Sequence, residues 1–221
     1  MMLVFKKRIE DIMDVSTLNA TLLLIAGLCC LGTGIAAFRR YSITQSERLF
    51  IVGVSMTMAA IGITSGALDT IPALNHYGLE WAWYVGTSFG YFLLFLSSIM
   101  KSAEQFRILR RWSIITGGVV ILMIILSPIL PDISHNQNAI VLLNTLRAAI
   151  CALGFSRYLA LYTSKETRFS LLLCLAFLSL MIGYVTVIAQ ALSPVIARFL
   201  LIDIIIRIIG NFLLFIAFIA G

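Results

Sequence analysis

Seven long apolar stretches run through this chain of 221 residues, and the short segments between them carry most of its charged side chains. A helix needs about 20 mostly apolar residues to cross the hydrocarbon core of a membrane, because each residue advances it by only about 1.5 Å. Each stretch is long enough for one crossing. The predicted spans are approximately 16–38, 49–70, 81–100, 112–130, 139–161, 169–191 and 198–220.

The composition places these stretches in a membrane rather than in a soluble core. Hydrophobic residues make up 61% of the chain and charged residues 12%, whereas an average soluble domain contains roughly 45–50% and about 25%. The stretches are continuously apolar, which favours helices over the alternating strands of an outer-membrane barrel. The connections are short and leave room for one domain, residues 1–221. We therefore predict an all-α integral membrane protein, a seven-transmembrane-helix bundle.

Basic residues mark alternate loops and thereby predict the orientation. Lysine and arginine stay on the cytoplasmic side of membrane helices, and they occur in the loops after the first, third and fifth predicted spans. The loops 71–80, 131–138 and 192–197 contain none. The N-terminus is then outside and the C-terminus cytoplasmic. The net charge of +6 is explained by these basic loop residues, which set the orientation in the membrane. We therefore expect no binding to nucleic acid.

The segment 1–15 precedes the first span and differs from it in composition. It carries Lys6, Lys7 and Arg8, which the predicted orientation places outside, together with three acidic residues that neutralise them. Its apolar residues Ile9 and Ile12 are spaced for one helical face. We predict a short interfacial helix here.

The side chains that usually perform catalysis or hold cofactors are poorly placed for either task. The cysteines lie in apolar stretches without a metal-type spacing, and His76 and His135 fall in loops, so neither a metal site nor a buried haem is expected. The seventh span contains no lysine for a retinal Schiff base. No recognised catalytic motif occurs in the spans. We expect no cofactor and no metal, and an enzyme that acts on lipid remains an open alternative without a named catalytic set.

The seventh span carries an acid, a base and an amide in a regular pattern. Asp203, Arg207 and Asn211 occur at i, i+4 and i+8, so a helix places them on one face. A charge at bilayer depth costs at least about 2.5–3.5 kcal/mol on insertion scales, and such residues face the bundle interior or water. Counted from Arg198, Asp203 lies about 7–8 Å deep and Arg207 about 13 Å deep. Asp203 and Arg207 can therefore pair along their own helix.

The fifth span supplies a second intramembrane arginine at a matching depth. Asn144 and Arg147 lie one turn apart, and Arg147 is about 12 Å from Ala139 at the predicted outer end. We therefore expect two arginines at one level in the outer half of the bundle. The side chains that could join them there are Asp69 in the second span, Trp83 in the third, and Tyr184 and Gln190 in the sixth.

Three interpretations of this cluster stay open. In the first it is a structural network, in which Asp203 neutralises Arg207 and Arg147 reaches Asp69 or backbone carbonyls. In the second the two arginines form the floor of a pocket that opens to the outside and binds an anionic or carbonyl-bearing ligand. In the third the cluster belongs to a proton or ion pathway, which a lone acid with one close arginine supports least.

The last helix also resembles part of a known family. The stretch "LLIDIIIRIIGNFLLFIAFI", with Arg207 followed by Ile208, Ile209 and Gly210, is similar, together with the span count and orientation, to the membrane-associated sensor domains of prokaryotic histidine kinases and diguanylate cyclases. The resemblance implies a sensory domain in a prokaryotic cytoplasmic membrane, whose last helix leads into a cytoplasmic signalling module. The stop at Gly221 fits either a short native protein or a piece of a longer polypeptide.

These observations predict a membrane-embedded sensory or ligand-binding domain. It would recognise a small or lipid-like ligand from the outer side and signal inward. The alternatives are an accessory or structural subunit of a membrane complex, and a small carrier or channel. The expected partners are membrane lipids, a small-molecule ligand, and a cytoplasmic signalling module, a partner subunit or a second copy of the chain.

Overall fold

The computed structural model describes residues 2–71, 77–131, 133, 136–193 and 201–220 and, within these ranges, the side chains of residues 16–219. The described residues form helices and turns and no strand. The elements are α1 (Met2–Thr44), α2 (Glu47–Asp69), α3 (Glu80–Ile99), α4 (Ala103–Leu126), the 3-10 helix η2 (Ser127–Ile129), α5 (Gln137–Lys165), α6 (Arg168–Leu192) and α7 (Ile202–Ala220). Seven of the helices are long and apolar enough to cross a membrane. The predicted all-helical fold is confirmed, and the chain has the helices of a multi-pass membrane protein.

Helix α4 begins at Ala103, well before the start that we predicted at residue 112. The Ser102 hydroxyl accepts a hydrogen bond from the backbone N–H of Gln105 at 3.2 Å, and the Gln105 side chain accepts one from the Ser102 N–H at 3.2 Å. This reciprocal capping box satisfies free N–H groups at the helix start. The basic residues that follow therefore belong to the first turns of α4 rather than to a loop.

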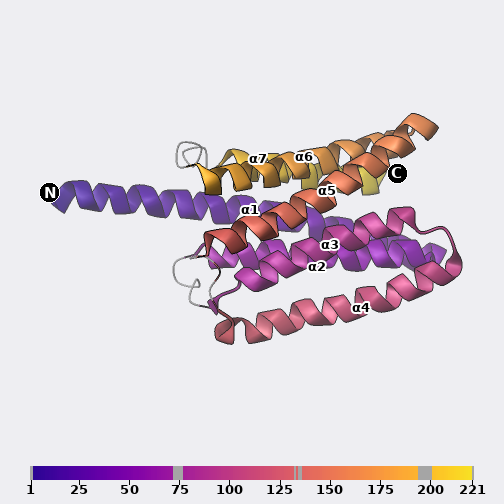
Figure 1. Ribbon diagram of the computed structural model, residues 1–221, viewed down its shortest axis with the longest axis horizontal. Coiled ribbons are helices and arrows are strands. Elements are labelled where there is room, and N and C mark those ends of the chain that lie inside the picture. Colours follow the sequence, from indigo (N-terminus) through magenta and orange to yellow (C-terminus); the bar gives the residue numbers. More distant parts are fainter. Residues whose placement is uncertain (1, 72–76, 132, 134–135, 194–200, 221) are drawn as a thin grey trace.

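Helix α1 is longer than one membrane crossing requires. It runs from Met2 to Thr44 without a break, so residues 2–15 continue the first span as helix, and in Figure 1 this part extends beyond the other helices. The side chains on which its interfacial placement depends lie outside the described ones. His76 and His135 also lie outside the described residues.

Six helices form a closed ring, and α4 lies outside it (Figure 1). Around the ring, α1 packs on α2, α2 on α3, α3 on α5, α5 on α6, α6 on α7, and α7 closes on α1. Helix α4 packs against α2 and α3. Helices α3 and α5 thus adjoin although α4 separates them in the sequence. The ring encloses an interior to which six helices contribute side chains.

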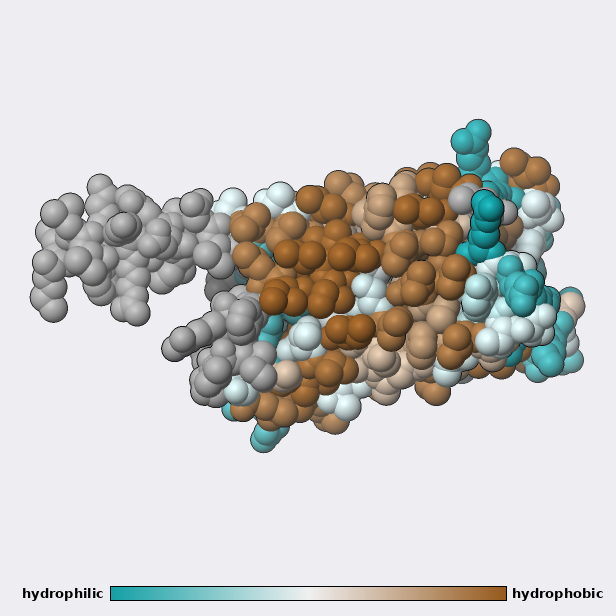
Figure 2. Space-filling view, turned by 90° about the horizontal axis from the view of Figure 1, so that it is seen from above, coloured by the Kyte–Doolittle hydropathy of each residue, from teal (hydrophilic) through white to brown (hydrophobic). Residues whose placement is uncertain are grey.

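The surface separates into an apolar body and one strongly basic end. Figure 2 shows hydrophobic residues along the body and hydrophilic residues gathered at the end opposite the N-terminus. The connections α1–α2, α3–α4 and α5–α6 lie there, with exposed basic side chains at Arg39, Arg48, Lys101, Arg107, Arg111, Lys165 and Arg168. We call this end the basic end, which the sequence predicts to face the cytoplasm, and the opposite end the outer end.

Helices α2 and α3 approach each other through glycines. A Cβ atom at Gly62 would lie 2.8 Å from the backbone nitrogen of Thr87, and one at Gly86 would lie 2.9 Å from the carbonyl oxygen of Met58. In lipid, such close packing supplies the attraction between helices that the hydrophobic effect supplies in water. On α4, by contrast, a Cβ atom at Gly117 would meet nothing within 4 Å.

We expect Gly62→Ala to destabilise the protein by about 1–3 kcal/mol, because the added methyl group has to push two helix backbones apart. Gly117→Ala is the matched control, and it should be neutral or stabilise by up to about 1 kcal/mol through its higher helix propensity. Denaturant titration of both purified variants in one detergent measures the difference. Equal stability of the two variants would contradict the contact described between α2 and α3.

Candidate functional site

The face of α7 that carries Asp203, Arg207 and Asn211 points into the ring, and all three side chains are buried. The Arg207 guanidinium forms an ion pair with the Asp203 carboxylate one turn away, and its Nε donates to the Asp203 carbonyl oxygen at 3.3 Å. From α6, the Gln190 amide donates to the other carboxylate oxygen of Asp203 at 3.5 Å. The charge of Arg207 is therefore neutralised on its own helix, as the spacing predicted.

A glycine in α6 makes room for Arg207. A Cβ atom at Gly183 would lie 2.5 Å from Cγ of Arg207, so any larger residue would force the arginine side chain to move. One turn away in α6, the Ser179 hydroxyl donates to the carbonyl oxygen of Ile206 at 2.8 Å and joins the two helices directly. Sequence reasoning missed the role of Gly183, because only the neighbour across the helix interface reveals it.

Asn211 joins three helices at the inner limit of this network. Its amide N–H donates to the Arg207 carbonyl oxygen at 3.0 Å. Its side-chain oxygen accepts a hydrogen bond from the Tyr91 hydroxyl of α3 at 2.9 Å and from the Cys30 thiol of α1 at 3.2 Å. Cys30 therefore contributes a polar contact as well as a small volume. Its partner is 181 residues away, so no local pattern could have identified it.

Arg147 of α5 is fully buried, with 0% of its surface exposed. One terminal nitrogen donates to the carbonyl oxygen of Trp83 at 2.8 Å and the other to the Asn144 side chain at 3.4 Å. Its guanidinium carbon lies 4.2 Å from the ring centre of Tyr84, 5.2 Å from that of Trp83 and 5.5 Å from that of Tyr184. These π faces attract the cation.

Among the described residues, the Nε donor and the positive charge of Arg147 each lack a partner of the usual kind. Its buried Nε has no hydrogen-bond partner, and in the part of the chain that the structure describes no carboxylate forms an ion pair with it. Of the two partners that the sequence left open, Arg147 contacts a backbone carbonyl, and Asp69, half-buried at the end of α2, is not among its contacts.

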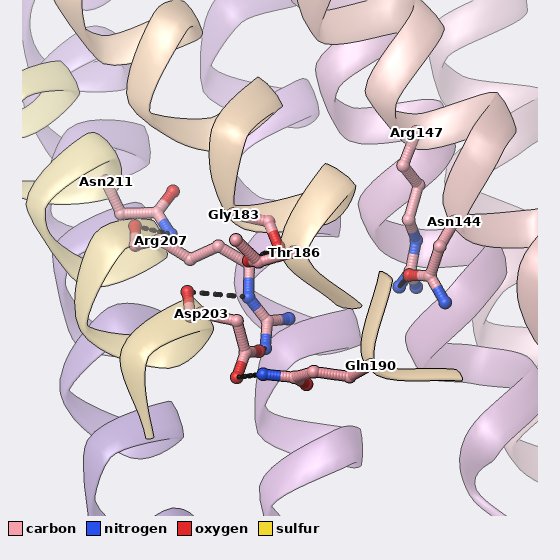
Figure 3. A network of polar contacts seen from close by, with 8 residues as sticks. All are labelled: Asn144, Arg147, Gly183, Thr186, Gln190, Asp203, Arg207 and Asn211. Carbon is pink, nitrogen blue, oxygen red and sulfur yellow. Dashed lines mark hydrogen bonds and ion pairs between the residues drawn. The ribbon is translucent and has the colours of Figure 1, made fainter. Parts of the chain in front are cut away.

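Tyr184 connects the two arginines. Its ring centre lies 5.5 Å from the guanidinium carbon of Arg147 and 5.6 Å from that of Arg207. Figure 3 shows Arg147 on α5 and Arg207 on α7 with both side chains directed toward the same end. The two guanidinium groups therefore lie near one aromatic ring, and their common depth in a membrane stays a prediction. Together with Asp203 they leave one formal positive charge in excess in this cluster.

The cavity that the structure describes beside the network is small. It is lined by Tyr91, Tyr184 and Arg207 among others and has room for about one water molecule. A larger ligand would have to displace side chains or separate helices. Toward the basic end the polar network is followed by fully buried apolar side chains, including Leu94, Leu173 and Leu214. Nearer the basic end a second group of buried polar side chains includes Ser97, Ser98 and Ser170, and Arg157 donates to the Ser98 carbonyl oxygen at 3.1 Å.

Comparisons of the chain with protein-family models, with curated proteins and with solved structures give no match. The resemblance of the last helix to membrane-associated sensor domains therefore stays a prediction from the sequence.

We expect Asp203→Asn to destabilise the protein by about 3–5 kcal/mol, because it leaves the Arg207 charge buried without its counter-ion. The double variant Asp203→Asn with Arg207→Met removes both charges and should recover most of that loss. Glu47→Gln is the matched control: it breaks the half-exposed Arg110–Glu47 pair, which should cost only about 0–1 kcal/mol. Denaturation in detergent measures all three. A loss for Asp203→Asn no larger than that of the control would contradict a tightly buried ion pair.

Proposed function

We propose that this chain is a membrane-embedded sensory domain that binds a small or lipid-like anion from the outer side and transmits the binding through α7. The observation that carries the proposal is Arg147. A fully buried guanidinium has lost its hydration, and this one has gained no carboxylate among the described residues. An anionic ligand would supply that missing partner.

The chemistry of the guanidinium favours a carboxylate as the recognised group. Arginine offers five N–H donors in a planar fork that matches two carboxylate oxygens. In Arg147 the Nε donor is unused, and one terminal nitrogen has only a long contact of 3.4 Å to Asn144. A carboxylate oxygen can accept from Nε while the terminal nitrogen on the same edge keeps its bond to Trp83. Binding would thus add contacts before it breaks any.

The position of the polar side chains supports entry from the outer end. Gln190 lies in the last turn of α6 and Asp203 in the first turn of α7, both at that end, and Arg207 lies one turn deeper. Buried apolar side chains such as Leu94 and Leu214 lie between this network and the basic end. Because the cavity described beside Arg207 holds about one water molecule, a ligand has to select a looser packing of α5, α6 and α7. The bound and empty states would therefore differ in helix positions.

Helix α7 can carry such a difference to the basic end. Its outer half bears Asp203 and Arg207, and near its other end the carbonyl oxygen of Ile219 accepts a hydrogen bond from Arg40 of α1 at 3.2 Å. A shift of α7 along or about its axis would change this contact. The readout at the basic end would then be the relative position of α1 and α7.

A second candidate is an accessory subunit of a membrane complex, in which the network only holds the helices together. The small cavity described beside the network favours it, since the network is compact without a ligand. Such a subunit should co-purify with larger membrane partners from its native source. A carrier or channel is less well supported, because buried apolar side chains such as Leu94 and Leu214 separate the arginine network from the basic end, and flux into liposomes would test it.

We expect a carboxylate to stabilise the purified protein through Arg147 and Arg207. The probes are straight-chain monocarboxylates of increasing length and their methyl esters, which keep the chain but lack the charge. At least one carboxylate should raise the thermal unfolding midpoint, its ester should not, and Arg147→Met and Arg207→Met should each lose the response.

Arg110→Met is the control for this experiment, because Arg110 pairs with Glu47 at the surface and should not affect the response. The Arg147→Met protein should remain folded, since an apolar side chain removes an uncompensated buried charge. If both Met variants respond as the native protein does, the arginines are not the binding site. A series with no carboxylate-specific response would favour the accessory subunit.

A further inference from the structure

An apolar groove lies between α3 and α4 on the outside of the ring. Its volume is about 420 Å³, and nearly all of the surface that lines it is apolar. Leu93 and Leu109 are buried in its floor, and Phe92, Ile108 and Trp112 are exposed along it. The groove exists because α4 stands outside the ring and covers α3 only in part. It is separate from the buried arginine network and does not depend on the function proposed above.

The groove is as tall as one leaflet of a membrane. It reaches from Phe89 to Met100 on α3 and from Gln105 to Thr116 on α4. At 1.5 Å per residue each of these stretches is about 16–17 Å long, which is about half of the roughly 30 Å hydrocarbon core. A partner helix that crosses the membrane would need a groove of full height. One acyl chain from a single leaflet fits this length.

The mouth of the groove lies at the basic end of the molecule. Lys101 follows Met100 directly, and its backbone N–H donates to the Gln105 side chain at 3.0 Å. Because Met100 and Gln105 both line the groove, this bond holds Lys101 at its mouth. Arg107 and Arg111 are exposed in the first turns of α4, but at about 100° per residue they fall on the side of that helix away from the groove. None of these three basic residues forms an ion pair within the part of the chain that the structure describes.

We propose that this groove binds one acyl chain of an anionic phospholipid, whose headgroup is held by Lys101. The apolar lining and its height select the acyl chain, and the positive charge of Lys101 selects an anionic over a zwitterionic headgroup. Arg110, by contrast, is engaged by Glu47 and takes no part. The site would attach a specific lipid to the helix that lies outside the ring.

Trp112 in the groove gives a direct test. In a background of Trp81→Phe and Trp83→Phe, Trp112 is the single tryptophan of the chain. The protein is reconstituted into mixed vesicles of phosphatidylcholine and phosphatidylglycerol, in which one or the other lipid carries brominated chains at equal mole fraction. We expect brominated phosphatidylglycerol to quench Trp112 more strongly than brominated phosphatidylcholine does.

The variant Lys101→Gln should lose this excess quenching, and Lys165→Gln should keep it, because Lys165 is exposed at the same end but ends α5 away from the groove. Equal quenching by both lipids would show that Trp112 meets only bulk lipid and would overturn the proposal. So would a Trp112 shielded from both lipids, since the groove would then be covered by protein, such as a second copy of the chain.

Discussion

An arginine buried among helices needs compensation for the hydration that it loses, and the two in this ring obtain it in different ways. Arg207 has the Asp203 carboxylate one turn away on its own helix. Arg147 has a carbonyl group and three aromatic faces. The arrangement of helices follows from these needs. Helix α3 adjoins α5 and presents Trp83, and α6 lies between α5 and α7 and places Tyr184 against both cations.

The parts of this arrangement that depend on one helix alone could be predicted from the sequence. Span length and hydropathy are such properties, and so is the i, i+4 pairing of Asp203 with Arg207. The contacts of Arg147 could not be predicted, because they depend on α3 adjoining α5 past the intervening α4. For the same reason the sequence did not indicate the roles of Cys30 and Gly183. Without its packing partner, Cys30 reads as a small apolar residue and Gly183 as a common helix glycine.

The two arginines also differ in what they leave available. Arg207 is engaged by Asp203 and, through its helix, by Asn211, so it contributes mainly to the rigidity of the ring. Arg147 keeps an unused donor, and among the described residues no carboxylate pairs with its charge. Under the proposed function, Arg207 with its bound carboxylate would hold the network together, and Arg147 would contact the ligand first. Because the cavity described beside Arg207 is small, ligand binding and helix packing would then compete for the same space.

Closure of the ring by its first and last helices also bears on how the protein is made. Cys30 and Asn211 meet across 181 residues, so the inward faces of α1 and α3 lack their contacts with α7 until the ribosome has finished that helix. That last helix brings an arginine, a costly residue for the translocation channel to release into lipid. Because Asp203 travels on the same helix, α7 can leave the channel with its two charges already neutralised. If the acid were on another helix, each of the two segments would carry an unpaired charge until both had reached the channel.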